Sequence, residues 1–206
     1  MQTIRMALLV IFHPIVAFQY IKKLRDRFNY MPIIILLLSV IASRCFAIYF
    51  THFPLAEIHP REANIFLEIF KLFLPVFTWT VASFALTSIL DGECQFREIL
   101  MATAYSMLPY ILVTIPLTIL SRILEGEQQG FYDTAQTIMW IWIILLILIS
   151  LKELNDYSVL KTIMVALLGL FTMIVIWATV VLFFAIVSQF LNFIQEVLVE
   201  VRYKFY

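Results

Sequence analysis

The sequence predicts an all-α fold, a polytopic membrane helix bundle with five transmembrane helices and an N-terminal interfacial amphipathic helix. First, 63% of its 206 residues are hydrophobic and 14% are charged, whereas a soluble domain is roughly 45–50% apolar and about a quarter charged. A soluble fold of this length cannot bury that excess, because its surface is too large for its volume. Second, the apolar residues form runs of about 20, the length that crosses the hydrocarbon core as a helix. Third, the charged residues gather at the ends of those runs.

Five apolar runs give the five predicted spans, at residues 31–50, 72–90, 99–120, 135–151 and 159–190. The fourth run is short unless Phe131 and Tyr132 extend it. The fifth run exceeds the bilayer thickness, so it tilts or projects from the membrane. The chain therefore divides into an interfacial segment, residues 1–30, and a single five-span membrane domain, residues 31–206.

The N-terminal segment has the pattern of an amphipathic helix. Its apolar residues recur every three or four positions and share one helical face: Ile11, Ile15, Phe18, Ile21, Leu24 and Phe28. Its basic residues lie on the other side, near its end: Lys22, Lys23, Arg25 and Arg27. This pattern predicts a helix on the membrane surface whose basic face meets anionic headgroups. A cleaved signal peptide at residues 1–18 is the alternative, but Arg5 is its only positive charge and no small-residue cleavage site follows.

The distribution of Lys and Arg predicts the orientation, because these residues are enriched in cytoplasmic segments. With five spans, one side carries Arg5, Lys22, Lys23, Arg25, Arg27, Arg97, Lys152 and Lys161. The other side carries fewer: Arg61, Lys71, Arg122, Arg202 and Lys204. We therefore expect the N-terminus in the cytoplasm and the C-terminus outside the cell membrane.

Two short polar loops face the predicted cytoplasm. Their candidate partner-binding residues are Asp91, Glu93 and Arg97 in the second loop, and Lys152, Glu153, Asp156 and Tyr157 in the fourth. A structural interpretation competes at both places, since Gly92 suits a tight turn and Ser158 or Asp156 suits the cap of the next helix.

Arg44 is a charge in the middle part of a predicted span, where a charge costs about 2.5–3.5 kcal/mol unless it snorkels or pairs. It either reaches external headgroups or Glu57 or Glu62, or it has an internal partner or an anion contact. Pro109 and Pro116 lie on one side of the third span and can bend it, which suits a cavity. Acidic residues are missing from the predicted span interiors, which argues against proton-coupled transport.

No motif predicts an enzyme, a cofactor or a nucleic-acid partner. His52, Glu57, His59 and Glu62 share the first external loop, but their spacing matches no compact metal motif, so we expect no metal site. Cys45 and Cys94 form no CxxC or disulfide framework and are interpreted as small buried residues.

Several short motifs resemble the Yip1 domain family, particularly its bacterial branch. They are His13-Pro14 with Phe18 and Ile21, Asp91-Gly92-Glu93 with Phe96, Ala104-Tyr105, Leu108-Pro109-Tyr110, and Lys152-Glu153 with Tyr157-Ser158. The resemblance implies five spans and a cytoplasmic N-terminus, and it supplies no catalytic residues. Eukaryotic members work with small GTPases in vesicle traffic, and bacterial relatives include accessory proteins that act beside ABC transporters.

Two functional hypotheses follow. The first is a non-enzymatic integral membrane adaptor that binds a membrane partner, such as an ABC transporter subunit, or itself. The second is a small transporter or lipid-handling protein that uses a cavity near Arg44 and the Pro109 and Pro116 kinks.

Overall fold

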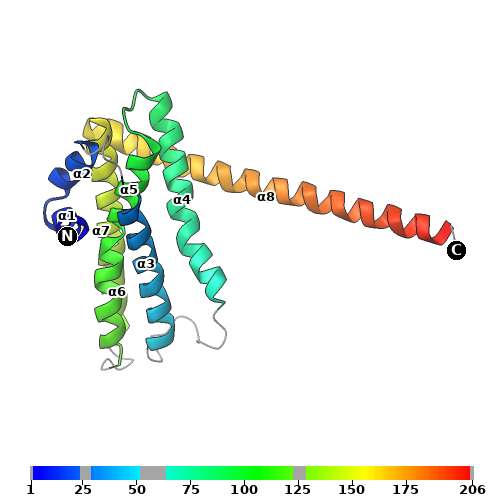
Figure 1. Ribbon diagram of the computed structural model, residues 1–206, viewed down its shortest axis with the longest axis horizontal. Coiled ribbons are helices and arrows are strands. Elements are labelled where there is room, and N and C mark those ends of the chain that lie inside the picture. The colour runs from blue at the N-terminus through cyan, green and yellow to red at the C-terminus, as the bar shows by residue number, and fades with distance from the viewer. Residues whose placement is uncertain (1, 24–28, 52–63, 123–128, 205–206) are drawn as a thin grey trace.

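The computed structural model describes residues 2–23, 29–51, 64–122 and 129–204, and this part of the chain contains helices and no strands. In chain order the helices are α1 (Gln2–Phe12), α2 (Pro14–Lys23), α3 (Met31–Phe50), α4 (Ile65–Ile89), α5 (Phe96–Ser106), α6 (Leu108–Leu120), α7 (Gln129–Asn155) and α8 (Val159–Lys204). Helices α3 to α7 form an upright bundle, α1 and α2 lie against one end of it, and α8 leaves from that same end (Figure 1).

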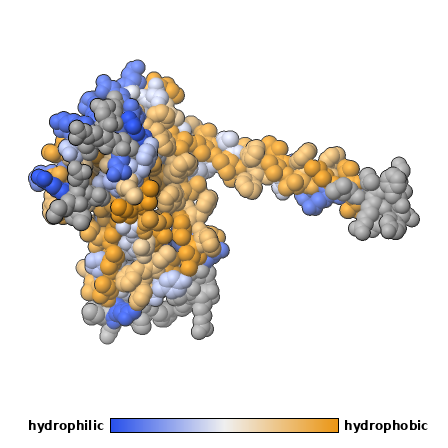
Figure 2. Space-filling model, viewed as in Figure 1, coloured by the Kyte–Doolittle hydropathy of each residue, from blue (hydrophilic) through white to orange (hydrophobic). Residues whose placement is uncertain are grey.

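Five helical segments of the described chain are long and apolar enough to cross a membrane. They are α3, α4, α5 together with α6, α7, and α8 as far as Val197. On the face shown in Figure 2, apolar residues cover the flank of the bundle and hydrophilic residues gather toward its ends. The predicted class, an all-α polytopic membrane bundle with five spans, is therefore confirmed.

The predicted N-terminal helix is two helices, because the chain breaks at His13 and Pro14. Proline has no N–H to continue a helix, so Pro14 begins α2, and the His13 carbonyl accepts the next hydrogen bond from the Ala17 N–H at 3.1 Å. Phe18 and Ile21 of the predicted apolar face are buried and Ile11 is partly buried, but Ile15 is half exposed. The remaining predicted residues, Leu24 and Phe28 on the apolar face and Arg25 and Arg27 on the basic face, lie outside the described residues.

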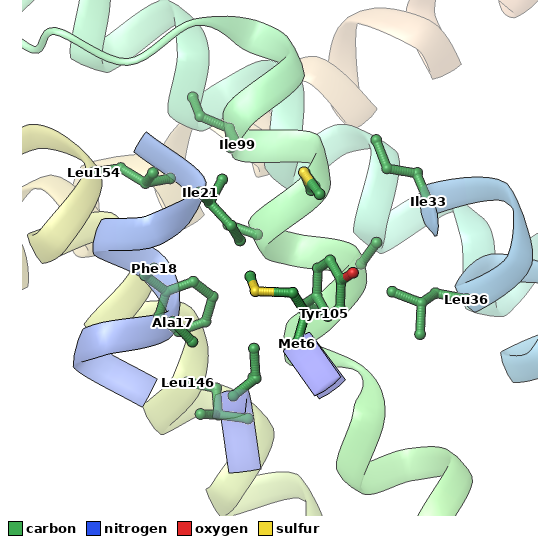
Figure 3. Packing of buried hydrophobic residues seen from close by; sticks show 14 of the residues in the cluster. Met6, Ala17, Phe18, Ile21, Ile33, Leu36, Ile99, Tyr105, Leu146 and Leu154 are labelled. Carbon is green, nitrogen blue, oxygen red and sulfur yellow. The ribbon is translucent and has the colours of Figure 1, made fainter. Parts of the chain in front are cut away.

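The N-terminal helices complete the hydrophobic core at their end of the bundle. Phe18 and Ile21 from α2 and Met6 from α1 pack around Tyr105 of α5 (Figure 3). Ile33 and Leu36 of α3 and Leu146 and Leu154 of α7 close the same cluster. The apolar face of α2 therefore contacts protein, where the sequence pattern alone predicts contact with lipid.

The span boundaries differ from the predicted ones where polar residues continue a helix. Helix α4 begins at Ile65, one to two turns before the predicted start, and so includes Glu68 and Lys71. Helix α7 includes Phe131 and Tyr132 at one end, and it extends through 152–155, which the sequence assigns to a loop. Asn64 stabilises the early start of α4, since its side chain accepts a hydrogen bond from the Leu67 N–H.

The third span is interrupted at Met107, between α5 and α6. In a continuous helix the N–H of residue 109 would bond the Tyr105 carbonyl, and Pro109 has no N–H. The Met107 N–H instead reaches the Ala104 carbonyl at 3.2 Å, a tighter turn, and α6 starts again at Leu108. The predicted bend at Pro109 is thus a break in the helix, and Pro116 lies within α6.

Helix α8 packs on the bundle only near its start. Val165 and Ala166 are buried, and Gly169 lies so close to α4 that a Cβ atom there would approach the Trp79 ring to 3.1 Å. From Trp177 to Val197 every residue is exposed, and the helix extends away from the bundle with apolar residues along most of its length (Figures 1 and 2). The helix also continues past the predicted end at residue 190.

Candidate functional site

A cavity of about 370 Å³ lies between α3, α4, α6 and α7. We call it the Arg44 pocket. Its charged residues are Arg44 from α3 and Glu68 and Lys71 from α4. The uncharged polar residues of its lining are Thr51, Tyr110, Thr114, Tyr132 and Gln136, and the apolar ones include Leu72, Met107, Leu117, Met139 and Trp140. The pocket thus combines a charged group with apolar walls, which is the usual composition of a small-molecule site.

Glu68 holds both cations of the pocket. Its Oε2 accepts hydrogen bonds from Arg44 Nη2 at 2.7 Å and Nε at 3.2 Å, and its Oε1 accepts one from Lys71 Nζ at 2.8 Å. Glu68 is 5% exposed, so its charge depends on these partners. Arg44 thus has a partner within the bundle, as one of its two interpretations predicts; Glu57 and Glu62, the partners named in the other, lie outside the described residues, so that pairing stays a prediction.

Glu68 is not among the predicted site residues, because the predicted second span begins at residue 72. Glu68 instead belongs to the first turn of α4, at the start of a candidate span that begins at Ile65. Glu68 and Lys71 lie three residues apart, a spacing that pairs side chains on a helix. That spacing, directly before an apolar run, is the signal that could have placed them at the start of the helix.

The break in the third span opens onto the Arg44 pocket. Met107, the residue between α5 and α6, lines the pocket together with Tyr110 and Thr114 of α6. Pro75 lines the opposite side, within α4. Interrupted helices at membrane depth often mark binding sites, because irregular backbone is tolerated where it lines a cavity.

A second group of polar residues joins three elements at the other end of the bundle. We call it the turn cluster. It lies where α2, the α4–α5 turn and the end of α7 with the α7–α8 turn meet. Its residues are Gln19, Lys22, Asp91, Glu93, Lys152, Glu153, Asp156 and Tyr157. Lys22 of α2 forms ion pairs with Asp156 and, at 3.2 Å, with Glu93. Burial lowers the pKa of Lys22, but its hydrogen bonds to Asp156 and Glu93 outweigh this, so the net pKa is raised.

Glu153 and Tyr157 point into the turn cluster. Glu153 Oε2 accepts a hydrogen bond from Gln19 Nε2 at 2.7 Å, and its Oε1 accepts one from Lys152 Nζ at 2.8 Å. The Tyr157 hydroxyl donates to the Leu90 carbonyl at 3.0 Å. Both residues are buried, so they contribute little surface for a partner.

The predicted partner-binding residues are thus brought to one end of the bundle, but several of them already have partners within the chain. Arg97 Nε donates to the side chain of Gln95 at 2.6 Å. Asp91 and Asp156 adopt positive φ angles of 56° and 52°, which aspartate tolerates in turns. The acidic members Asp91, Glu93 and Asp156 remain exposed at the surface of the turn cluster.

Gly92 and Cys94 lie beneath that surface. A Cβ atom on Gly92 would lie 2.5 Å from Asn155 Oδ1 and 2.7 Å from Thr87 Cβ, so only glycine fits there. Burial raises the pKa of the Cys94 thiol, which lies 3.4 Å from Thr87 Oγ1. The tight turn expected at Gly92 is confirmed, and Ser158 caps α8 by accepting the Lys161 N–H at 3.3 Å.

This chain of five candidate spans matches a known family over most of its length. The family model of the Yip1 domain matches residues 8–188. The chain belongs to the Yip1 domain family. The match runs from α1 into α8 and includes both the Arg44 pocket and the turn cluster. Searches of curated proteins and of solved structures give no match.

Within the described residues, this Yip1 domain has no group of three or more His, Cys, Asp or Glu residues placed to hold a metal ion. His52, Glu57, His59 and Glu62 lie outside the described residues, so the expectation for that loop stays a prediction. The chain is a multi-pass Yip1 membrane protein.

Proposed function

We propose that this Yip1 protein is a non-enzymatic membrane accessory protein that binds another membrane protein through α8. One observation carries the proposal: the segment from Trp177 to Val197 is exposed throughout, on a helix that extends away from the bundle (Figure 1). A helix that is apolar on most sides needs hydrocarbon or protein around it. The adaptor hypothesis therefore gains a candidate surface on α8.

Polar residues on α8 favour a protein partner over lipid alone. Ser188, Asn192 and Gln195 are spaced four and three residues apart, so they share one face of the helix. Among the described residues, Asn192 and Gln195 have no hydrogen-bond partner from another element. Amide and hydroxyl side chains in membrane helices pair across helix contacts, which is a more favourable state than facing lipid.

The proposed partner is another helical membrane protein. The family resemblance suggests an ABC transporter subunit, and a second copy of this chain is the alternative. The exposed acids of the turn cluster, Asp91, Glu93 and Asp156, would contact the cytoplasmic part of such a partner if that end faces the cytoplasm. We propose the cell membrane as the location, with the N-terminus inside and the C-terminus outside.

Crosslinking from α8 tests the proposal in the membrane. A photo-reactive residue at Asn192 should give a discrete crosslinked protein band, and purification in mild detergent should recover the same protein. The same probe at Ile141 of α7, which is 57% exposed and apolar, is the control and should give lipid adducts only. Recovery of the chain alone, with no crosslink from Asn192 above the Ile141 background, would reject the adaptor function.

A small transporter or lipid-handling protein is the second candidate, and the Arg44 pocket favours it. The cavity contains a buried carboxylate with two cations and is lined by the interrupted third span. This candidate requires the pocket to bind a ligand, whereas the adaptor function does not.

A further inference from the structure

We propose that the Arg44 pocket binds the anionic headgroup of a membrane lipid, with Lys71 as the cation that reaches its phosphate or carboxylate oxygens. This inference rests on the second candidate function and specifies its ligand. It is independent of α8 and of any protein partner.

Lys71 has the donors and the freedom for this role. Its ammonium group carries three N–H donors, and the structure gives it one acceptor, Glu68 Oε1 at 2.8 Å. Its side chain is 60% exposed, while that of Glu68 is 6% exposed. Lys71 can therefore donate to a ligand oxygen while Glu68 keeps it at the mouth of the pocket.

Arg44 and Glu68 form the fixed base of the site. The Arg44 side chain is 25% exposed and bonds Glu68 through two nitrogens. A carboxylate held in this way cannot turn to other partners without leaving a partly buried charge unpaired. The pair keeps Arg44 inside the pocket and positions Lys71, which lies one helical turn after Glu68.

The depth of the charged residues matches a lipid headgroup. Arg44 precedes the end of α3 by six residues, so it lies about 9 Å below the helix end at the rise of 1.5 Å per residue. Glu68 and Lys71 are in the first two turns of α4, at the same end of the bundle. Headgroup phosphates occupy this boundary layer, and cations near helix ends contact them there.

The remaining lining distinguishes a lipid from a free anion. Leu72, Met107 and Trp140 form apolar walls beside the charged group, and a free phosphate would leave them without a partner. A lipid would cover them with its glycerol and first acyl carbons. The cavity of about 370 Å³ suits a headgroup and this region, with the acyl chains extending into the bilayer.

Native mass spectrometry of the full, delipidated chain tests the inference with phosphatidylglycerol as the anionic probe and phosphatidylcholine as the zwitterionic one. The wild-type protein should bind phosphatidylglycerol more tightly. Lys71→Gln should weaken that binding at least tenfold, because one charge-assisted hydrogen bond is lost. Lys71→Arg keeps the charge and should stay within a few-fold of the wild type, whereas Lys71→Gln should keep the wild-type melting temperature in detergent, which separates loss of the charge from a folding defect.

Arg122→Gln is the matched control. Arg122 is an exposed cation at the same end of the bundle, lies 5.4 Å from the centre of the Phe50 ring and does not line the pocket. Its removal should change binding less than twofold. An equal loss in Arg122→Gln and Lys71→Gln would overturn the inference, because general attraction to the charged end would then explain the binding.

Two further outcomes are informative. One distinguishes a lipid headgroup from a free anion, and the other distinguishes failure of this inference from failure of the second candidate function. Glycerol phosphate, which has the headgroup chemistry without acyl chains, should compete only at far higher concentration; competition equal to that of the lipid would overturn the lipid assignment. If the wild type binds neither lipid, the lipid-handling form of the second candidate function fails together with this inference. If it selects phosphatidylglycerol but Lys71→Gln binds equally well, only the inference about this pocket fails.

Discussion

The Tyr157 hydroxyl donates a hydrogen bond to the Leu90 carbonyl at 3.0 Å, across 67 residues of sequence. Leu90 is the C-cap of α4, and Tyr157 lies in the turn between α7 and α8. The carbonyls at a helix end have no partner within the helix. Tyr157 supplies one, and in doing so it ties the end of the second span to the beginning of the last.

Tyr157→Phe should therefore destabilise the protein by about 1 kcal/mol, the usual net value of one hydrogen bond whose acceptor loses its partner. Thermal unfolding in detergent measures this. Tyr20→Phe is the control, because Tyr20 is 44% exposed and should tolerate the loss of its hydroxyl. Equal melting temperatures for Tyr157→Phe and the wild type would show that water replaces the bond.

Gly92→Ala should destabilise the protein by about 1–3 kcal/mol, since a new Cβ at 2.5 Å from Asn155 Oδ1 forces the two turns apart. Gly130→Ala is the matched control: nothing lies within 4 Å of its Cβ position, in the first turn of α7. Alanine there should be neutral or stabilise by up to about 1 kcal/mol through helix propensity. Similar effects of both substitutions on unfolding would contradict the close packing of the turns.

How far the sequence predicts this structure depends on whether a feature is local. Length and apolar content are local properties, so the five spans were predictable, and so was the turn at Gly92. The packing of Phe18 and Ile21 was not, because a helix with an apolar face has the same sequence pattern on lipid as on a protein core. The continuation of α7 through Asn155 also depends on a partner, since Gln19 of α2 bonds Glu153 in that last turn.

The Arg44 pocket was predictable in part. A charge in an apolar run indicated that Arg44 needs a partner, but the choice among Glu57, Glu62 and Glu68 depends on how α3 and α4 pack. Pro109 indicated a bend, and the break at Met107 follows from the missing N–H. The break and the ion pairs line the same cavity because of how the helices pack. Residue spacing in a single sequence does not predict that packing.

Cys94 should react slowly with thiol reagents at neutral pH, because burial raises its pKa and keeps the thiol protonated and covered. In a Cys45→Ser background, the rate of alkylation of Cys94 reports opening of the turn cluster. Gly92→Ala should raise that rate about tenfold for each 1.4 kcal/mol of local destabilisation. A wild-type rate equal to that of the unfolded protein would show that the thiol is not protected.

Lys22 should stabilise the folded protein only while it is charged. Its folded pKa is raised above the ordinary value of 10.5, so its contribution is full below that value and is lost as the pH rises through the folded pKa. The partners are largely exposed, so Lys22→Met should cost only about 0.2–1 kcal/mol at neutral pH. Lys23→Met, at the neighbouring exposed lysine, should cost less. The stability difference between the wild type and Lys22→Met should shrink above about pH 10.5; a constant difference would contradict the ion pairs.

We expect the turn cluster to lie on the cytoplasmic side of the membrane. Three of the cations predicted to be cytoplasmic lie at one end of the bundle. Lys22 pairs with Glu93 and Asp156, and Lys152 pairs with Glu153. The Lys161 ammonium group lies 4.3 Å from the centre of the Tyr157 ring. Lys71 and Arg122 lie at the other end. Since insertion retains the more basic end inside, an impermeant thiol reagent applied to intact cells should label a cysteine at Arg122 but not one at Lys23. In a cysteine-free background, labelling at Lys23 alone would show the reverse orientation, and the acids of the turn cluster could then contact only external partners.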